Sequence, residues 1–270
     1  MFLPVQKLLA TWRMTVAAAA RTCGSIWPMQ HSSYLLALSR DGEAFGEACA
    51  AAGLSAPVSS CPGWSVADLV WHLTEVHHFW RTIVGEQRPT WEGYEQPPRP
   101  SDGDLLLEYR AGFALTLATL SAADPAQANW TWSADHTAGF VVRRMAQETA
   151  MHRWDADTAA DTVTPIEAEL ASDGIDEFLT HMLSDVVTDA QPVGGSVHLH
   201  CTDVAGEWTV RESADGKQVV TREHAKGDAA LRGPASDLLL ALWRRTGIAS
   251  VDVVGDRAVA ERFIAHTSLA

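Results

Sequence analysis

A carboxylate and a histidine stand four residues apart in a segment that otherwise has the spacing of a buried helix face. Glu148 and His152 continue a row that contains Val141, Met145 and Ala156, at intervals of three or four residues. Residues at these intervals lie one above another on a helix. A buried carboxylate costs free energy unless its charge is compensated. The row therefore predicts an inward-facing helix whose polar pair meets partner groups inside the fold.

A second apolar segment supplies a third group of this kind. Ser65 and Asp68 have the spacing of a capping box that opens a helix. Within that helix, His72 lies in a row with Leu69, Val76, Phe79 and Ile83. Two imidazoles and one carboxylate suit zinc better than nickel or iron, and three protein ligands leave a position open, as in catalytic zinc sites. The alternative is a hydrogen bond between Glu148 and His152, with His72 as an ordinary buried histidine. Spacing alone leaves both interpretations open.

Four further residues near these candidate ligands have more than one interpretation. Asp155, on the same side of the helix as the histidine of the pair, can orient a ligand, hold a substrate amine or remain a surface acid. Arg144, one turn before the glutamate, can pair with an anionic substrate or be solvated. His77 has the position of a histidine in the core or at its rim. Trp154 can pack in the core or line a pocket.

The charge balance and the cysteines limit the partners of the chain. Its 270 residues carry a formal net charge of -14 without a clear basic patch, which argues against a nucleic-acid partner. No apolar stretch approaches the roughly 20 residues that span a bilayer, so we expect no membrane partner. The four cysteines form no C-x-x-C pair and are too sparse for a disulfide framework. We therefore expect a cytoplasmic location, where thiols stay reduced.

The N-terminal segment has no clear place in a fold. Two basic residues precede the alanine-rich run 14–20, superficially like a signal peptide, but the run is short, is built of alanine and ends at Arg21. We expect residues 1–30 to be a poorly ordered extension. Met14 and Met29 are alternative translation starts.

The remaining chain divides into a helical part and a mixed part. Helical periodicity, caps and Gly or Pro breaks predict helices over 31–52, 66–85, 104–120, 137–162 and 167–188. Beyond the Gly- and Pro-containing stretch 191–195 the period changes, and we expect strands over 196–201, 207–210, 218–221 and 251–254, with helices over 234–245 and 257–265. The expected domains are a metal-binding helical bundle over 31–190 and a small α+β domain over 191–270.

Three segments resemble one protein family. Residues 61–73, Cys-Pro-Gly-Trp-Ser-Val-Ala-Asp-Leu-Val-Trp-His-Leu, resemble the opening motif of the mycothiol-dependent maleylpyruvate isomerase family, part of the DinB-like superfamily. Residues 144–156, which contain the Glu–His pair, are similar to its second motif, and residues 227–245 resemble its C-terminal domain. The resemblance covers residues 31–265 and implies an α+β fold, with an N-terminal DinB-like four-helix bundle followed by a small α/β sterol-carrier-like domain.

The family resemblance also implies a site. It implies zinc bound by the two histidines and Glu148, with mycothiol as the thiol cofactor. It places Asp155 near the metal and implies an arginine from the C-terminal domain, for which Arg245 is the best match by context. We expect catalytic roles for Asp155 and Arg245, and contacts with the cofactor for Arg144 and Trp154.

The function implied by the resemblance is thiol chemistry on a small molecule. We expect a zinc- and mycothiol-dependent enzyme, a cis–trans isomerase or an S-transferase, in which zinc favours the thiolate and the thiolate attacks an electrophile. Its partners would be a small-molecule electrophile and a low-molecular-weight thiol, and the protein would be a monomer or homodimer. The alternatives are a non-catalytic DinB-like protein that binds a metal or small ligand, and a hydrolase that uses zinc-bound water.

Overall fold

The protein consists of two compact units. The computed structural model describes residues 29–183, 192–213 and 217–267, and the chain divides between Thr164 and Pro165. The expected extension lies outside the described residues, apart from Met29 and Gln30. No described helix combines the length and the apolar character needed to cross a membrane.

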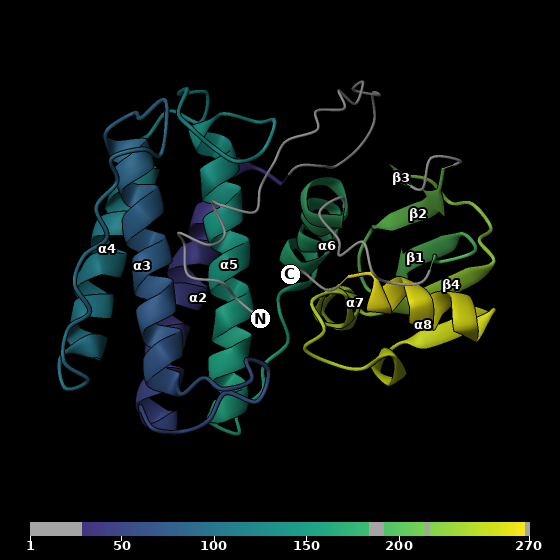
Figure 1. The fold of residues 1–270 in the computed structure, drawn as a ribbon, viewed down its shortest axis with the longest axis horizontal. Coiled ribbons are helices and arrows are strands. Elements are labelled where there is room, and N and C mark those ends of the chain that lie inside the picture. Colours follow the sequence, from purple (N-terminus) through teal and green to yellow (C-terminus); the bar gives the residue numbers. More distant parts are fainter. Residues whose placement is uncertain (1–28, 184–191, 214–216, 268–270) are drawn as a thin grey trace. The chain divides into compact units, whose positions relative to one another are not determined.

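Four long helices form the described part of the first unit (Figure 1). They are α2 (His31–Ala52), α3 (Val66–Gly85), α4 (Leu105–Ala122) and α5 (Ala138–Ala159). Helices α2 and α3 each pack against both α4 and α5. The predicted four-helix bundle is therefore confirmed, because the apolar faces of all four helices meet in one core.

The predicted capping box fixes the start of α3. Ser65 Oγ accepts a hydrogen bond from the Asp68 amide at 3.3 Å, and the Asp68 carboxylate accepts one from the Ser65 amide at 3.0 Å. These bonds satisfy two backbone donors that a helix N-terminus would otherwise leave unpaired. At the start of α5, Thr137 Oγ1 accepts from the Phe140 amide. Side-chain caps thus set the beginnings of the two helices that carry the candidate ligands.

Large apolar side chains fill the space between the four helices. The fully buried ones include Leu38, Phe45, Leu69, Leu73, Phe79, Ile83, Leu105, Tyr109 and Leu120. Helices α2 and α4 approach closely at Gly42, whose carbonyl oxygen accepts a hydrogen bond from Tyr109 Oη at 2.9 Å. A Cβ atom at Gly42 would lie 2.1 Å from Phe113 Cζ, so this packing requires glycine.

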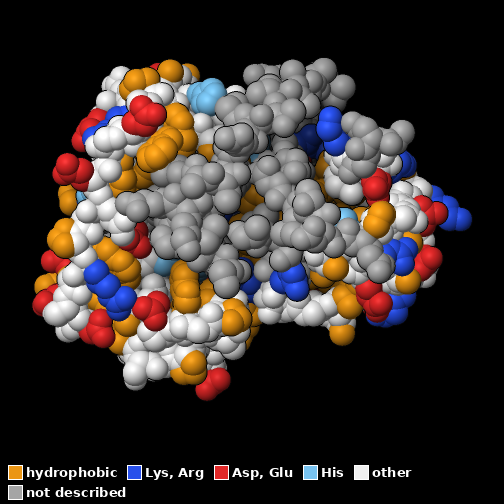
Figure 2. Space-filling view, in the orientation of Figure 1, with side chains coloured by type: hydrophobic (Ala, Val, Ile, Leu, Met, Phe, Trp, Pro, Cys, Tyr) orange, Lys and Arg blue, Asp and Glu red, His pale blue; other side chains and the backbone are white. Residues whose placement is uncertain are grey.

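The outer surface of the bundle is mixed in character. On the face drawn in Figure 2, acidic, basic and apolar side chains lie interspersed. Large apolar residues that are exposed in the bundle include Leu36 on α2 and Leu107 and Leu115 on α4. Scattered exposed side chains of this kind are usual on globular domains and do not mark a binding site.

The second unit contains a five-stranded sheet with helices packed against it. Its strands are β1 (Val197–Cys201), β2 (Glu207–Glu212), β3 (Gln218–Thr221), β4 (Ala229–Gly233) and β5 (Asp252–Gly255), in the order β3-β2-β1-β4-β5. Strands β1 and β4 are parallel and the other pairs antiparallel. The helical elements among its described residues are α6 (Ala168–Glu177), η1 (Phe178–Met182), α7 (Ala235–Leu242), η3 (Ile248–Ser250) and α8 (Arg257–Ala265). The expected α+β class is confirmed.

The two faces of the sheet differ in chemistry. Leu199 of β1 pairs with Trp208 of β2 and Leu231 of β4, and all three side chains are buried. Trp208 Nε1 donates a hydrogen bond to Asp176 of α6 at 3.0 Å, so α6 covers this face. Because side chains alternate along a strand, His198, next to Leu199, points to the opposite face.

Helix α6 belongs with the sheet rather than with the bundle. The sequence predicted a helix that bridges to the second unit and placed the domain boundary after it, at residue 191, but the second unit begins at Pro165. Helix α6 packs against α7, and Ser172 Oγ donates to the Ala205 carbonyl at 2.9 Å. Residues 192–195 of the glycine- and proline-containing stretch form a loop inside the second unit, and the end of the expected helix, 184–188, lies outside the described residues. The apolar face of α6 is buried by α7 and the sheet, which a helical period alone does not indicate.

Candidate metal centre

The three candidate ligands converge between α3 and α5. His72 comes from α3, and Glu148 and His152 come from α5, one helical turn apart. The Nε2 atoms of both histidines approach the same carboxylate oxygen, Glu148 Oε1, at 3.3 Å for His72 and 3.2 Å for His152. One ligand atom from each residue lies within 4.8 Å of the others. The structure thus brings together the three residues that the sequence singled out.

Asp155 contacts the ligand set through His152. Its Oδ2 accepts a hydrogen bond from His152 Nδ1 at 2.9 Å, and its Oδ1 accepts one from Ser60 Oγ at 2.6 Å. The Asp155 side chain is fully buried, so it is not a surface acid. A carboxylate in this position fixes the tautomer of the histidine, with the proton on Nδ1. His152 Nε2 is then the atom left to face Glu148 or a metal.

The contact between His152 and Glu148 requires a positive species between the two acceptors. With Nδ1 donating to Asp155, a neutral His152 presents a lone pair at Nε2, 3.2 Å from the carboxylate oxygen. Either a second proton on the imidazole or a cation resolves this repulsion. Two imidazole nitrogens and one carboxylate oxygen are also a donor set that zinc prefers. The residues therefore fit a divalent metal ion.

The charges in the site shift the pKa values of both members of the pair. Burial raises the pKa of Glu148, but hydrogen bonds with His152 and His72 and the charge of Arg144 outweigh burial and hold it well below its ordinary value. Burial lowers the pKa of His152, but its bonds with Asp155 and Glu148 act in the opposite direction and leave it raised. Glu148 is therefore a carboxylate. A metal ion would replace the proton on Nε2 of His152, while the Nδ1 proton stays on the bond with Asp155.

Arg144 contacts the ligand set directly. Its Nη2 donates to Glu148 Oε2 at 2.8 Å, while the other oxygen, Oε1, faces the histidines. The Arg144 side chain is almost fully buried. The structure pairs Arg144 with a candidate ligand, and its expected contact with the cofactor or an anionic substrate stays a prediction. This ion pair orients the carboxylate and compensates part of its charge.

Trp154 and His77 lie at other positions in the bundle. Trp154 is buried on α5, and it follows His152 by two residues, which is about 200° around the helix, so the two side chains leave α5 in different directions. His77 Nε2 lies 2.8 Å from Thr149 Oγ1, and burial lowers its pKa to about 3. As expected for a core histidine, it is neutral and packs beside Phe113.

The loop before α3 adds residues to which the sequence assigned no role at the site. Besides Ser60, Cys61 Sγ lies 3.8 Å from Asp155 Oδ2. The ring of Trp64 lies 5.1 Å from the ring of His72. The available signal was the compact Cys-Pro-Gly-Trp turn immediately before a capped helix, a place where loop residues are held rigidly beside helix residues.

Arg245 belongs to the second unit. It follows α7, which ends at Leu242 rather than at the expected residue 245, because the chain turns at Arg244 with a φ of 57°. Arg245 Nη1 donates to the Trp243 carbonyl at 3.3 Å, and its guanidinium carbon lies 5.8 Å from the centre of the Trp243 ring. Its catalytic role stays a prediction.

Comparisons with known proteins agree with these two units. The model described as mycothiol maleylpyruvate isomerase N-terminal domain matches residues 35–157, and the model of the C-terminal domain of the same family (MDMPI) matches residues 169–262. The solved structure of a mycothiol-dependent maleylpyruvate isomerase has a TM-score of 0.57 at 10% identity, and a histidine-to-alanine mutant has 0.55 at 11%. Each comparison covers 83% of this chain and 93% of the other, which shows a shared fold.

No curated protein sequence matches the chain. With both domain models matched in order, the chain belongs to the mycothiol maleylpyruvate isomerase family.

Proposed function

We propose that this protein is a zinc-dependent enzyme that uses mycothiol to isomerise, or to transfer the thiol to, a small electrophilic substrate. The observation that carries the proposal is the convergence of two imidazole nitrogens on one carboxylate oxygen inside the bundle. Membership of the isomerase family supports mycothiol as the cofactor and maleylpyruvate-like cis–trans isomerisation as the reaction. The zinc ligands would be His72, Glu148 and His152.

The charge of the site suits an anionic cofactor. Among the described residues at the site, Glu148 and Asp155 carry two negative charges and Arg144 carries one positive charge, so a divalent ion brings the charge of this set to +1. When bound, zinc lowers the pKa of a coordinated thiol so that the thiolate, a nucleophile for an activated double bond, prevails near neutral pH. Three protein ligands leave a position for that thiolate.

The protein residues around the ligands hold them in place. Ser60 orients Asp155, and Asp155 in turn holds the imidazole of His152 with its Nε2 toward the metal position. Arg144 holds the second oxygen of Glu148, which leaves the first for the metal. Such outer contacts reduce the freedom of the ligands and raise their affinity for the ion. The Trp64 ring lies beside His72 and gives this end of the site an apolar wall.

The test combines metal content with thiol-dependent turnover. We would measure zinc in tag-free protein and screen small electrophiles, maleylpyruvate among them, with and without mycothiol. The His152→Ala variant should lose one zinc equivalent and all mycothiol-dependent turnover. The matched control is His136→Ala, which removes an exposed histidine of the same unit and should change neither.

The outcomes separate the enzyme from the alternatives. Unchanged zinc content or unchanged turnover in His152→Ala contradicts the ligand assignment. Loss of zinc from a protein that shows no turnover with any electrophile supports the non-catalytic metal-binding alternative. Turnover that needs zinc but not mycothiol supports the hydrolase instead.

A further inference from the structure

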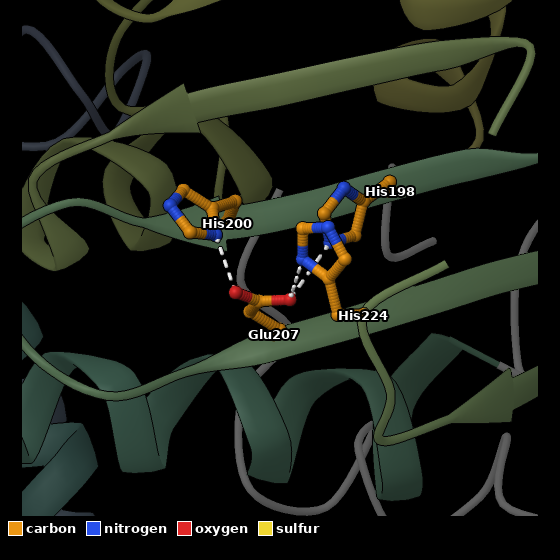
Figure 3. Close-up of side chains that lie close together, drawn as sticks. All are labelled: His198, His200, Glu207 and His224. Atoms are coloured by element: carbon orange, nitrogen blue, oxygen red, sulfur yellow. Dashed lines mark hydrogen bonds and ion pairs between the residues drawn. The ribbon is translucent and has the colours of Figure 1, made fainter. Parts of the chain in front are cut away.

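A second cluster of histidines surrounds a carboxylate on the sheet of the C-terminal unit (Figure 3). His198 and His200 are two residues apart on β1 and therefore point to the same face of the sheet. Glu207, on the neighbouring strand β2, is the direct cross-strand partner of His200. His224 follows β3 and extends over the same carboxylate (Figure 3).

The four side chains converge on one point. His200 Nδ1 lies 2.8 Å from Glu207 Oε1, and His224 Nδ1 lies 2.5 Å from Oε2. His198 Nε2 lies 3.4 Å from Glu207 Oε2. The ring centres of the three histidines lie 5.2 to 6.3 Å apart. One ligand atom from each of the four residues lies within 4.8 Å of all the others.

Hydrogen bonds do not account for the whole cluster. Glu207 accepts from His200 and His224. The Nε2 atom of His198 is buried and makes an ion-pair contact with the same carboxylate at 3.4 Å, but it makes no well-oriented hydrogen bond with any described residue. The His198 side chain is 9% exposed, so water does not freely supply that bond. A buried imidazole nitrogen without a well-oriented hydrogen bond costs free energy unless a ligand occupies the space in front of it.

We propose that His198, His200, Glu207 and His224 form a second site for a divalent transition metal, with zinc as the preferred ion. Three imidazoles and one carboxylate make a complete tetrahedral set without thiolate ligands. Ligand atoms of a tetrahedral zinc site lie about 3.3 Å apart, since zinc–nitrogen bonds are about 2.0–2.1 Å long. Small side-chain rotations would bring the present separations into that range.

The number of ligands gives this site a different role from that of the bundle site. A set of four protein ligands leaves no open position and is typical of structural rather than catalytic zinc. The ion would join β1 to β2 and hold the segment that carries His224 against the sheet. Since no residue is shared with the bundle site, the proposal does not depend on the proposed function.

The experiment counts metal ions in full-length variants. Tag-free apoprotein would be dialysed against Zn²⁺, freed of excess metal and assayed for bound zinc. The variants are His152→Ala, the double variant His200→Ala/His224→Ala, and the combination of all three. His200 and His224 are 28% and 79% exposed, so their removal leaves the core packing intact. His136→Ala is the control, because it removes an exposed histidine outside both clusters.

The expected zinc content is two equivalents for the wild type and the control. It is one for His152→Ala, one for the double variant and none for the combination. The His152→Ala protein loaded with Co²⁺ should show the intense visible absorption of a four-coordinate site, and the double variant loaded in the same way should retain only the bundle signal.

Two results would overturn the second site: a His152→Ala protein without zinc, or a double variant that still holds two equivalents. If His152→Ala keeps two equivalents while the double variant loses one, the bundle ligands are wrong and the second site stands. Circular dichroism of each variant shows whether a lost zinc reflects a lost ligand or a lost fold.

Discussion

Asp155 is the residue through which the loop before α3 acts on a candidate ligand. Its two oxygens receive hydrogen bonds from Ser60 and His152, so it connects a rigid turn to the imidazole. The family resemblance placed this acid near the metal. The contacts define its role more narrowly: it fixes which nitrogen of His152 is free and where that nitrogen points.

The first prediction concerns Asp155→Asn. The change removes the charge that holds the Nδ1 proton of His152, so the Nε2 atom is no longer fixed toward Glu148. We expect zinc affinity at the bundle site to fall about 10- to 100-fold. Competition with a chromophoric chelator measures this, in the His200→Ala/His224→Ala background where only one site remains. The control Asp161→Asn alters an exposed acid whose φ of 55° asparagine tolerates, and it should leave affinity unchanged.

The second prediction concerns Arg144→Met. The variant leaves Glu148 without its 2.8 Å ion-pair partner inside the bundle. Removing one partner of a buried pair costs about 3 kcal/mol of unfolding free energy, and we expect this loss in metal-free protein. Saturating zinc should restore part of it, because the ion supplies the missing positive charge. Urea unfolding with and without zinc measures both effects.

Arg110→Met serves as the control for Arg144→Met. Arg110 is exposed on α4, so its removal should change stability by less than about 0.5 kcal/mol with or without zinc. If Arg144→Met is as stable as the wild type in the absence of metal, the ion pair with Glu148 does not compensate the buried carboxylate, and its charge is balanced elsewhere.

At the scale of elements, the close packing of α2 against α4 requires a glycine at position 42. A Cβ atom at Gly42 would meet the Phe113 ring at 2.1 Å, and Tyr109 already bonds to the carbonyl of the same residue. We therefore expect Gly42→Ala to destabilise the bundle by about 1–3 kcal/mol through overpacking. Thermal unfolding of Gly42→Ala, Phe113→Leu and the double variant tests this.

The double variant decides whether the contact is the cause. Phe113→Leu removes ring atoms from the place that the new methyl group would occupy, so the double variant should lose less stability than the sum of the single losses. Gly103→Ala is the matched control, because its Cβ meets no atom nearer than 3.8 Å. If the stability losses of the two single variants add up in the double variant, the destabilisation by Gly42→Ala arises in the backbone of α2 rather than in the contact with Phe113 of α4.

The elements also show which parts of the site a sequence can predict. Helical spacing and the Ser65 cap depend on neighbours along the chain, so α3, α5 and the inward direction of Glu148 followed from the sequence. The contact between Ser60 and Asp155 joins residues 95 positions apart and depends on how the loop returns to α5. The His198 cluster depends on the register between β1 and β2, which alternation within one strand does not specify.

At the scale of the whole molecule, the boundary between the two units lies at Pro165, before α6, whereas the sequence predicted it after this helix, at residue 191. Helix α6 follows four helices and has their period, and the domain boundary predicted at residue 191 grouped it with the bundle. The bundle, however, already buries the faces of α2 to α5 against one another. The partners of α6 are α7 and Trp208, which come later in the chain. Each unit thus has a core of its own and, in our proposals, a metal site of its own.

The last prediction follows from this division. Ligand that binds only the folded state at 100 times its Kd adds about 2.7 kcal/mol of stability to the unit that binds it. The same free energy shifts the Tm of a unit of about 100 residues roughly 1.6 times as far as that of one of about 160 residues, because unfolding entropy scales with the number of residues. We expect calorimetry of the full chain to show two transitions that both rise with zinc, the C-terminal one by more. In His152→Ala only the C-terminal transition should rise, and in His200→Ala/His224→Ala only that of the bundle. A zinc-induced rise of both transitions in either variant would contradict the assignment of one site to each unit.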